Sequence, residues 1–84
     1  MRVTVRFFAS LREITCMDMI EIDLPQGSRS GDVRNALTDH LSSDAIAAID
    51  EGEVKVALNQ VILSVEKNLN DGDEVAFMPP ITGG

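Results

Sequence analysis

The apolar residues of this chain change their spacing twice, and this change restricts the possible folds more than any other feature. Residues 3–8 and 20–24 alternate between apolar and polar side chains almost throughout, which is typical of half-buried β-strands. Pro25-Gln26-Gly27 then ends the second segment. Residues 10–18 are expected to be a loop that joins the two strands, so the first part of the chain is predicted to be an antiparallel hairpin.

The spacing becomes helical in the middle of the chain. A stripe at positions i, i+3, i+4, i+7 and i+8 predicts an amphipathic helix, and it consists of Val33, Ala36, Leu37, His40 and Leu41. Ser30 is the expected N-cap, and Asp32 in the first turn suits the positive end of the helix dipole. A second, shorter helix is expected over residues 43–49.

Alternation returns in the second half of the chain. Residues 54–58 and 75–78 are predicted strands, residues 61–63 are a short one, and residues 70–73 (Asn-Asp-Gly-Asp) are a strong turn signal. Strands at both ends with the helices between them imply a two-layer α+β domain, in which a four- to five-stranded sheet packs on one main helix and a short helix. The connection from the second strand to the third is long enough for a crossover, so the sheet is predicted to be mixed.

Length and charge narrow the range of functions. Eighty-four residues make one domain, and no stretch approaches the roughly 20 apolar residues that cross a bilayer. Arg2 and Arg6 interrupt the N-terminal segment, so no signal peptide is expected, and the single cysteine, Cys16, fits a cytoplasmic protein. A formal charge of −7 repels phosphate backbones and anionic lipids. We therefore expect a protein partner with a basic surface, and neither a nucleic acid nor a membrane.

One face of the predicted sheet carries apolar residues that no predicted helix covers. The alternation places Phe8 and Met78 on the face opposite the helix, and Ile62 joins them if its short strand keeps the same parity. Their neighbours on this face are Thr4, Arg6 and Ala76. Exposed apolar groups that cluster indicate an interaction surface, whereas isolated ones are normal. Two interpretations stay open: a docking surface for a partner, or apolar padding of the sheet.

No group of side chains inside the domain suggests catalysis. His40 lies on the apolar stripe of the helix without a second histidine or a cysteine beside it, so a partly buried packing role is expected. Cys16 lies in the expected loop without a histidine partner, and Glu21 and Asp23 fit the solvated side of a strand. We predict no metal site, no permanently bound cofactor and no catalytic residue within the domain.

The C-terminal segment is the remaining candidate for chemistry. Pro79-Pro80 cannot continue a central strand, so residues 1–80 are expected to form the domain and Ile81-Thr82-Gly83-Gly84 a flexible tail. The two glycines lack a Cβ and can pass through a narrow channel of another protein. A free carboxylate is a poor acyl donor, so reaction at Gly84 requires activation by an ATP-using partner, most directly as an acyl-adenylate. A sulfur nucleophile can then displace AMP and leave a thiocarboxylate, which makes the chain a reactant.

Several segments resemble one family. Residues 69–75 (LNDGDEV), which lead into the last strand, and the final Gly83-Gly84 resemble the ubiquitin-like β-grasp sulfur carriers. Residues 7–13 (FFASLRE), 56–60 (VALNQ) and 77–84 (FMPPITGG) are similar to the small subunits of molybdopterin synthase. This likeness spans nearly the whole chain.

The resemblance implies a part in molybdenum cofactor biosynthesis. Gly84 matches the glycine that is adenylated and then converted to a thiocarboxylate, with Gly83 as its threading neighbour. The sulfur is expected to pass to cyclic pyranopterin monophosphate in the synthase large subunit, which forms molybdopterin. The implied docking residues are Phe8, Ile62, Met78, Pro79, Pro80, Ile81 and Thr82, with methionine in place of the family's usual phenylalanine at position 78.

Three partners follow from the same resemblance. They are the large subunit, in an assembly of two small and two large subunits, an E1-like adenylating enzyme that consumes ATP, and a sulfurtransferase that supplies the sulfur. Three alternatives remain open. A sulfur carrier for thiamine thiazole synthesis has the same ending but is usually shorter and lacks the Pro79-Pro80 pair. A ubiquitin-like modifier would join Gly84 to lysines, and a plain binding module would not use the tail at all.

Overall fold

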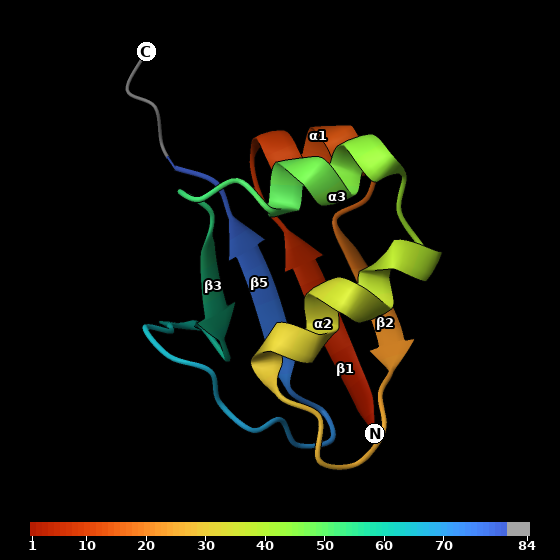
Figure 1. Ribbon diagram of the computed structural model, residues 1–84, viewed down its shortest axis with the longest axis vertical. Helices are drawn as coiled ribbons and strands as arrows, with labels where there is room; N and C mark the ends of the chain where they lie inside the picture. The colour runs from red at the N-terminus through yellow and green to blue at the C-terminus, as the bar shows by residue number, and fades with distance from the viewer. Residues whose placement is uncertain (81–84) are drawn as a thin grey trace.

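In residues 1–80, which the structure describes, the chain forms five strands and three short α-helices. The structure is a computed structural model (Figure 1). The elements in chain order are β1 (Arg2–Phe7), α1 (Ser10–Thr15), β2 (Met19–Asp23), α2 (Ser30–Ala36), the 3₁₀ turn η1 (Leu37–Asp39), α3 (Ser43–Ile49), β3 (Lys55–Leu58), β4 (Val61–Ile62) and β5 (Glu74–Met78). None of the helices in this part of the chain is long and apolar enough to span a bilayer.

The strands form a single mixed sheet in the order β2-β1-β5-β3-β4. The first and last strands, β1 and β5, are parallel neighbours at its centre, and every other pair is antiparallel. The predicted hairpin of the first two strands and the predicted mixed sheet are therefore confirmed. The expected reason for the mixed sheet was wrong, however, because β2 and β3 are not neighbours and the parallel pair joins the two ends of the chain.

The helices cover one face and one end of this sheet. Helix α2 crosses the front of the sheet, while α1 and α3 lie side by side at the end where β1 and β5 finish (Figure 1). This two-layer arrangement of a mixed sheet grasping a helix is the ubiquitin-like β-grasp fold. The α+β class and the β-grasp fold implied by the resemblance are thus confirmed.

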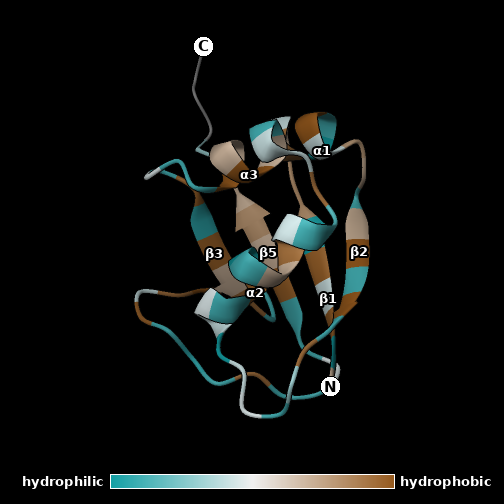
Figure 2. Ribbon diagram, turned by 45° about the vertical axis from the view of Figure 1, so that its right-hand side comes forward, coloured by the Kyte–Doolittle hydropathy of each residue, from teal (hydrophilic) through white to brown (hydrophobic). Residues whose placement is uncertain are grey.

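The core lies between the sheet and the helices. Figure 2 shows brown apolar segments along the strands and the helices that enclose it. The alternating residues Val3, Val5 and Phe7 of β1 are buried, and the ring of Phe7 stacks on that of Phe77 with 6.3 Å between centroids. Val33 and Leu37 from the helical layer pack onto the strand residues of the core, and both are fully buried. The inward positions predicted from the alternation are all buried or packed against this core.

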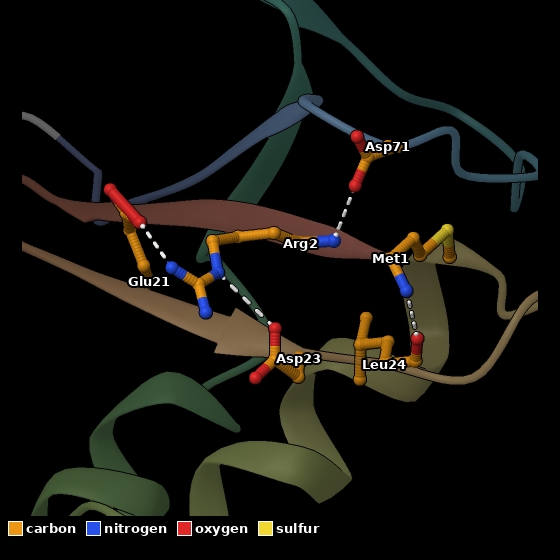
Figure 3. A network of polar contacts seen from close by, with 6 residues as sticks. All are labelled: Met1, Arg2, Glu21, Asp23, Leu24 and Asp71. Carbon is orange, nitrogen blue, oxygen red and sulfur yellow. Dashed lines mark hydrogen bonds and ion pairs between the residues drawn. The ribbon is translucent and has the colours of Figure 1, made fainter.

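The N-terminal strand is held at both of its neighbours by polar contacts (Figure 3). The backbone N–H of Arg2 donates to the carboxylate of Asp71 at 2.7 Å, and the terminal amine of Met1 donates to the Leu24 carbonyl at 2.7 Å. The Arg2 guanidinium reaches Asp23 and Glu21 on β2. These contacts fix the register of β1 between β2 and the turn before β5.

The segment 10–18 is not a simple loop, which corrects the first expectation. It contains α1, a helix of six residues whose buried residues, Leu11 and Thr15, are four positions apart. The helix begins after Ala9, which has a φ of 52° and provides no side-chain cap, and it ends at Cys16 in the left-handed region. Two buried residues are too few to produce a recognisable period, so the sequence pattern gives no signal for α1.

The main helix also differs from its prediction. It ends at Ala36, and the next turn, η1, is a 3₁₀ helix. A 3₁₀ turn has three residues per turn, so the apolar stripe changes phase and His40 is exposed, which contradicts its predicted packing role. The predicted N-cap is also wrong, because the helix starts at Ser30 itself and the Arg29 N–H donates to the Asp32 carboxylate at 2.8 Å. The shorter helix is confirmed as α3.

Candidate docking site

We call the sheet face opposite α2 the outer face. Its members are the residues whose parity along each strand is opposite to that of the core residues, as the pairing register places them side by side. They are Arg2, Thr4 and Arg6 of β1; Met19, Glu21 and Asp23 of β2; Lys55 and Ala57 of β3; Ile62 of β4; and Glu74, Ala76 and Met78 of β5.

Two of the three predicted apolar residues, Met78 and Ile62, are members of this face, and Phe8 extends it just beyond the end of β1. Phe8 follows the last residue of β1, its backbone N–H donates to the Phe77 carbonyl at 3.3 Å, and its side chain is 43% exposed. Continuing the parallel register sets Phe8 beside Met78, which is half-buried. Ile62 is 58% exposed on the edge strand, two strands away from β5, or about 10 Å at the usual strand spacing. Their role in docking a partner stays a prediction.

The register adds one apolar residue that the sequence reasoning missed. Met19 pairs with Arg6 on the outer face and is 42% exposed. Extending the alternation of Glu21 and Asp23 back by two residues would have placed it there. The middle of the face is formed by Ala57 and Ala76, which pair with each other across β3 and β5. Both are buried, so Ala76, although its face was predicted correctly, contributes little exposed surface.

The outer face is electrically neutral, although the chain is strongly acidic. It holds three basic residues, Arg2, Arg6 and Lys55, and three acidic ones, Glu21, Asp23 and Glu74. The chain has seven basic and fourteen acidic residues, so the four basic and eleven acidic side chains elsewhere account for its whole formal charge of −7. The stretch 35–54 alone contains five Asp and Glu residues and neither Lys nor Arg. Acidic charge is therefore concentrated away from the apolar cluster, by which we mean Phe8, Met78 and Ile62.

One ion pair crosses the centre of the outer face. The Nε of Arg6 donates to Oε2 of Glu74 at 2.9 Å, and the two side chains are 42% and 24% exposed. The Arg2 pairs with Glu21 and Asp23, which Figure 3 shows, lie on the same face near the start of β1 and are more exposed. A half-buried pair between neighbouring strands keeps both charges in place on an otherwise apolar part of the sheet.

The chain leaves the sheet at the same end as Phe8. Pro79 is half-buried and Pro80 is exposed, directly after β5 ends at Met78. Beside them is a hollow of about 410 Å³ whose walls are Ser10, Ala48, Glu51, Glu53, Val54, Pro79 and Pro80. The predicted site residues Ile81, Thr82, Gly83 and Gly84 lie outside the described residues, as does the predicted boundary between domain and tail.

Within residues 1–80, no cluster of three or more His, Cys, Asp or Glu side chains is arranged to hold a metal ion. Cys16 is exposed at the C-terminal end of α1 and His40 is exposed after η1, so the fold does not bring these two residues into one buried site. The features that the fold does bring together are the apolar cluster of the outer face and the proline-marked exit of the chain.

Comparison of the sequence with known protein families identifies the family of this chain. Residues 5–84, nearly the whole chain, match the ThiS family. The chain belongs to the ThiS family. Among its relatives is the molybdopterin synthase sulfur carrier subunit of Escherichia coli, which is 37% identical over 87 residues that cover 98% of this chain and 99% of the relative.

Two further similarities bear on function. The small archaeal modifier protein 3 of Haloferax volcanii is 30% identical to this ThiS-family chain, over the full length of both. The solved complex of subunits 1 and 2 of the molybdopterin-converting factor from Helicobacter pylori contains a chain with a TM-score of 0.71 and 25% identity, with full coverage of both chains. Relatives of this family member thus include sulfur carriers, a modifier and a protein solved with a second subunit.

Proposed function

We propose that the protein is a sulfur carrier for molybdenum cofactor biosynthesis, and that it acts as the small subunit of a molybdopterin synthase. The observation that carries this proposal is the 37% identity to the Escherichia coli sulfur carrier subunit across nearly both chains. The sulfur is carried on Gly84. An E1-like enzyme joins this carboxylate to AMP and releases pyrophosphate from ATP. A sulfurtransferase supplies the sulfur, a thiol reduces it to the level of sulfide, and the sulfide displaces AMP to give the thiocarboxylate.

In the second half of the cycle, the carrier docks on the synthase large subunit through its outer face. Phe8, Met78 and Ile62 supply the apolar contact, and Pro79-Pro80 directs the remaining residues toward the active site of the partner. There the thiocarboxylate transfers its sulfur to cyclic pyranopterin monophosphate. The neutral charge of the outer face supports this docking mode, because desolvating an apolar, balanced surface is less unfavourable than desolvating an acidic one.

The proposed cycle needs the same carrier to meet several proteins in turn. The adenylating enzyme and the large subunit both have to receive the segment after Pro80, so their binding surfaces on the carrier overlap and they bind one after the other. The assembly proposed for the synthase contains two small and two large subunits. The carrier itself needs no permanently bound cofactor, because ATP is consumed by the adenylating partner.

The direct test is the mass of the C-terminal peptide. The purified protein is incubated with ATP, a sulfur donor and the adenylating enzyme, and is then analysed intact and after fragmentation. Exchange of one oxygen for sulfur has the same nominal mass change as one oxidation, and the four methionines and Cys16 can each be oxidised, so fragmentation must locate the change. Sulfur on Gly84 is expected, and an unmodified terminus under these conditions would contradict the proposal.

Deletion of Gly84 provides the second arm of this test. The deletion is expected to abolish sulfur transfer and to leave the far-ultraviolet circular dichroism spectrum and melting temperature unchanged, because it removes no residue of the described core. Retained molybdopterin formation by the deletion variant would show that the sulfur is carried elsewhere.

A modifier function is the second candidate, because the Haloferax volcanii modifier protein is 30% identical over the full chain. It predicts isopeptide bonds between Gly84 and lysines of other proteins, visible as a ladder of conjugates that disappears when Gly84 is deleted. Absence of conjugates in cells that make molybdopterin with this carrier would leave sulfur transfer as its role.

A further inference from the structure

We propose that Arg6 selects and orients the partner on the outer face, by donating hydrogen bonds from its guanidinium to an uncharged oxygen of that partner. This inference rests on the proposed docking function and assigns a specificity-determining residue to it. Arg6 lies in a row across the sheet, between Met19 on one side and Ala76, Ala57 and Ile62 on the other. Ala76 and Ala57 do not extend beyond Cβ, so Arg6 is the one long polar side chain between two exposed apolar ones.

The ion pair leaves most of the guanidinium without a partner in the part of the chain that the structure describes. Arginine carries five N–H donors in a planar fork. Here Nε binds Oε2 of Glu74 at 2.9 Å, and the Nη atoms have no hydrogen-bond acceptor among residues 1–80. The side chain is 42% exposed, so water satisfies these remaining donors in the free protein.

Docking changes this balance. A partner that covers Phe8, Met78 and Ile62 also covers Arg6, which lies between β2 and β5 on the same face. Its Nη donors then lose water, and a buried donor without an acceptor is strongly unfavourable. A partner therefore binds tightly only if it places acceptors over Arg6, and one that presents only apolar groups is rejected. The planar fork also fixes the direction of approach, because its donors point in set directions.

The charge of the surroundings determines the kind of acceptor. Glu74 already neutralises Arg6, and the outer face as a whole carries three positive and three negative side chains. A carboxylate from the partner would add a second anion next to Glu74 on a molecule with a charge of −7. A backbone carbonyl, or the oxygen of an amide or hydroxyl side chain, satisfies the donors without this repulsion. We assign the acceptor to this uncharged class.

The experiment measures the dissociation constant for the synthase large subunit encoded in the same genome, by titration calorimetry with the full-length carrier. The Arg6→Met variant keeps a long apolar side chain and is expected to bind at least about tenfold more weakly. Arg6→Lys keeps the charge without the fork and should recover only part of the loss. Arg34→Met, the same change on α2 at the opposite side of the molecule, is the matched control and should bind like the wild type.

The double variant Arg6→Met/Glu74→Gln separates two roles for Arg6. If Arg6 binds the partner, the double variant stays as weak as Arg6→Met. If Arg6 only neutralises Glu74, removing both charges restores wild-type affinity, and this result would overturn the inference, as would undiminished binding by Arg6→Met. Failure of the wild type to bind the large subunit, or to support molybdopterin formation with it, would instead remove the proposed function on which the inference rests. Melting curves of every variant show that the fold is retained.

Discussion

At the residue scale, Phe8 is the side chain whose replacement tests the outer face most directly. Phe8→Asp places a charge where the proposed partner excludes water, and is expected to weaken binding of the large subunit by roughly 1–3 kcal/mol. The matched control is Val65→Asp, because Val65 is 63% exposed in the loop between β4 and β5 and is not a member of the outer face. Calorimetric titration of both variants is the measurement, and equal affinities would show that the partner docks on another face.

A second residue-scale prediction concerns the pair between Arg34 on α2 and Asp50 at the end of α3. Nε of Arg34 donates to Oδ1 of Asp50 at 2.8 Å, and Nη2 binds the other carboxylate oxygen. The hydrogen bond to Arg34 lowers the pKa of Asp50 below its ordinary value of 3.8. A lowered folded-state pKa stabilises the fold above the unfolded pKa, and this contribution is lost as the pH falls through the folded value.

The measurement is urea unfolding of the wild type and Arg34→Met across the acid range. The wild type is expected to be more stable at neutral pH, and the difference should shrink as the pH falls below 3.8. Titration of the Asp50 carboxyl by NMR should show its pKa rise toward the ordinary value in the variant. A stability difference that persists unchanged into strong acid would mean that the two residues act through packing.

Single residues of the site differ in how far the sequence could place them. Phe8 and Met78 follow from the alternation of their strands, because a period of two assigns each side chain to a face. The Arg6–Glu74 pair could not be predicted, since it depends on the parallel pairing of β1 with a strand almost at the other end of the chain. The predicted packing role of His40 was wrong because the helix changes to a 3₁₀ turn at Leu37, which leaves His40 exposed, whereas Leu41 still packs against the core.

At the scale of elements, α1 is the one that the sequence pattern did not reveal, and its contribution to stability can be measured. Leu11 is 2% exposed and belongs to the core, whereas Ile14 on the same helix is 42% exposed. Leu11→Ala is expected to lower the free energy of unfolding by about 2–5 kcal/mol, because it opens a cavity between the helices and the sheet. Ile14→Ala should change it by about 0.5 kcal/mol or less.

Urea unfolding of these two variants is the comparison that decides the point. Similar, small losses for both would indicate that α1 is not packed on the core as described. The elements that were predicted well have clear local signals: both N-terminal strands alternate, and the last strand is an apolar run between the turn at 70–73 and Pro79-Pro80. Those that were predicted poorly, α1 and the end of α2, are short or change helix type, so tertiary contacts and not local spacing determine them.

At the scale of the whole molecule, the uneven charge predicts how salt affects stability. Most acidic side chains lie off the outer face and repel one another, which destabilises the compact state. Raising NaCl from about 0.01 M to about 0.15 M shortens the screening length from roughly 30 Å to 8 Å. The melting temperature is therefore expected to rise over this range, as measured by calorimetry. A fall would mean that the surface ion pairs, which salt weakens, stabilise the fold more than the repulsion destabilises it.

The parallel pairing of β1 with β5 also has a consequence for how the protein is made. Thr4 pairs with Glu74, seventy residues further along the chain. The first strand to be synthesised therefore cannot form this pairing until the last strand has been made. At roughly 5–20 residues per second on the ribosome, this wait is about 4 to 14 s. During this time the apolar side of β1 lacks its central neighbour, and a chain interrupted before β5 never closes its sheet. The domain can therefore fold completely only after β5 has been synthesised, a few residues before the proposed reactive residue Gly84.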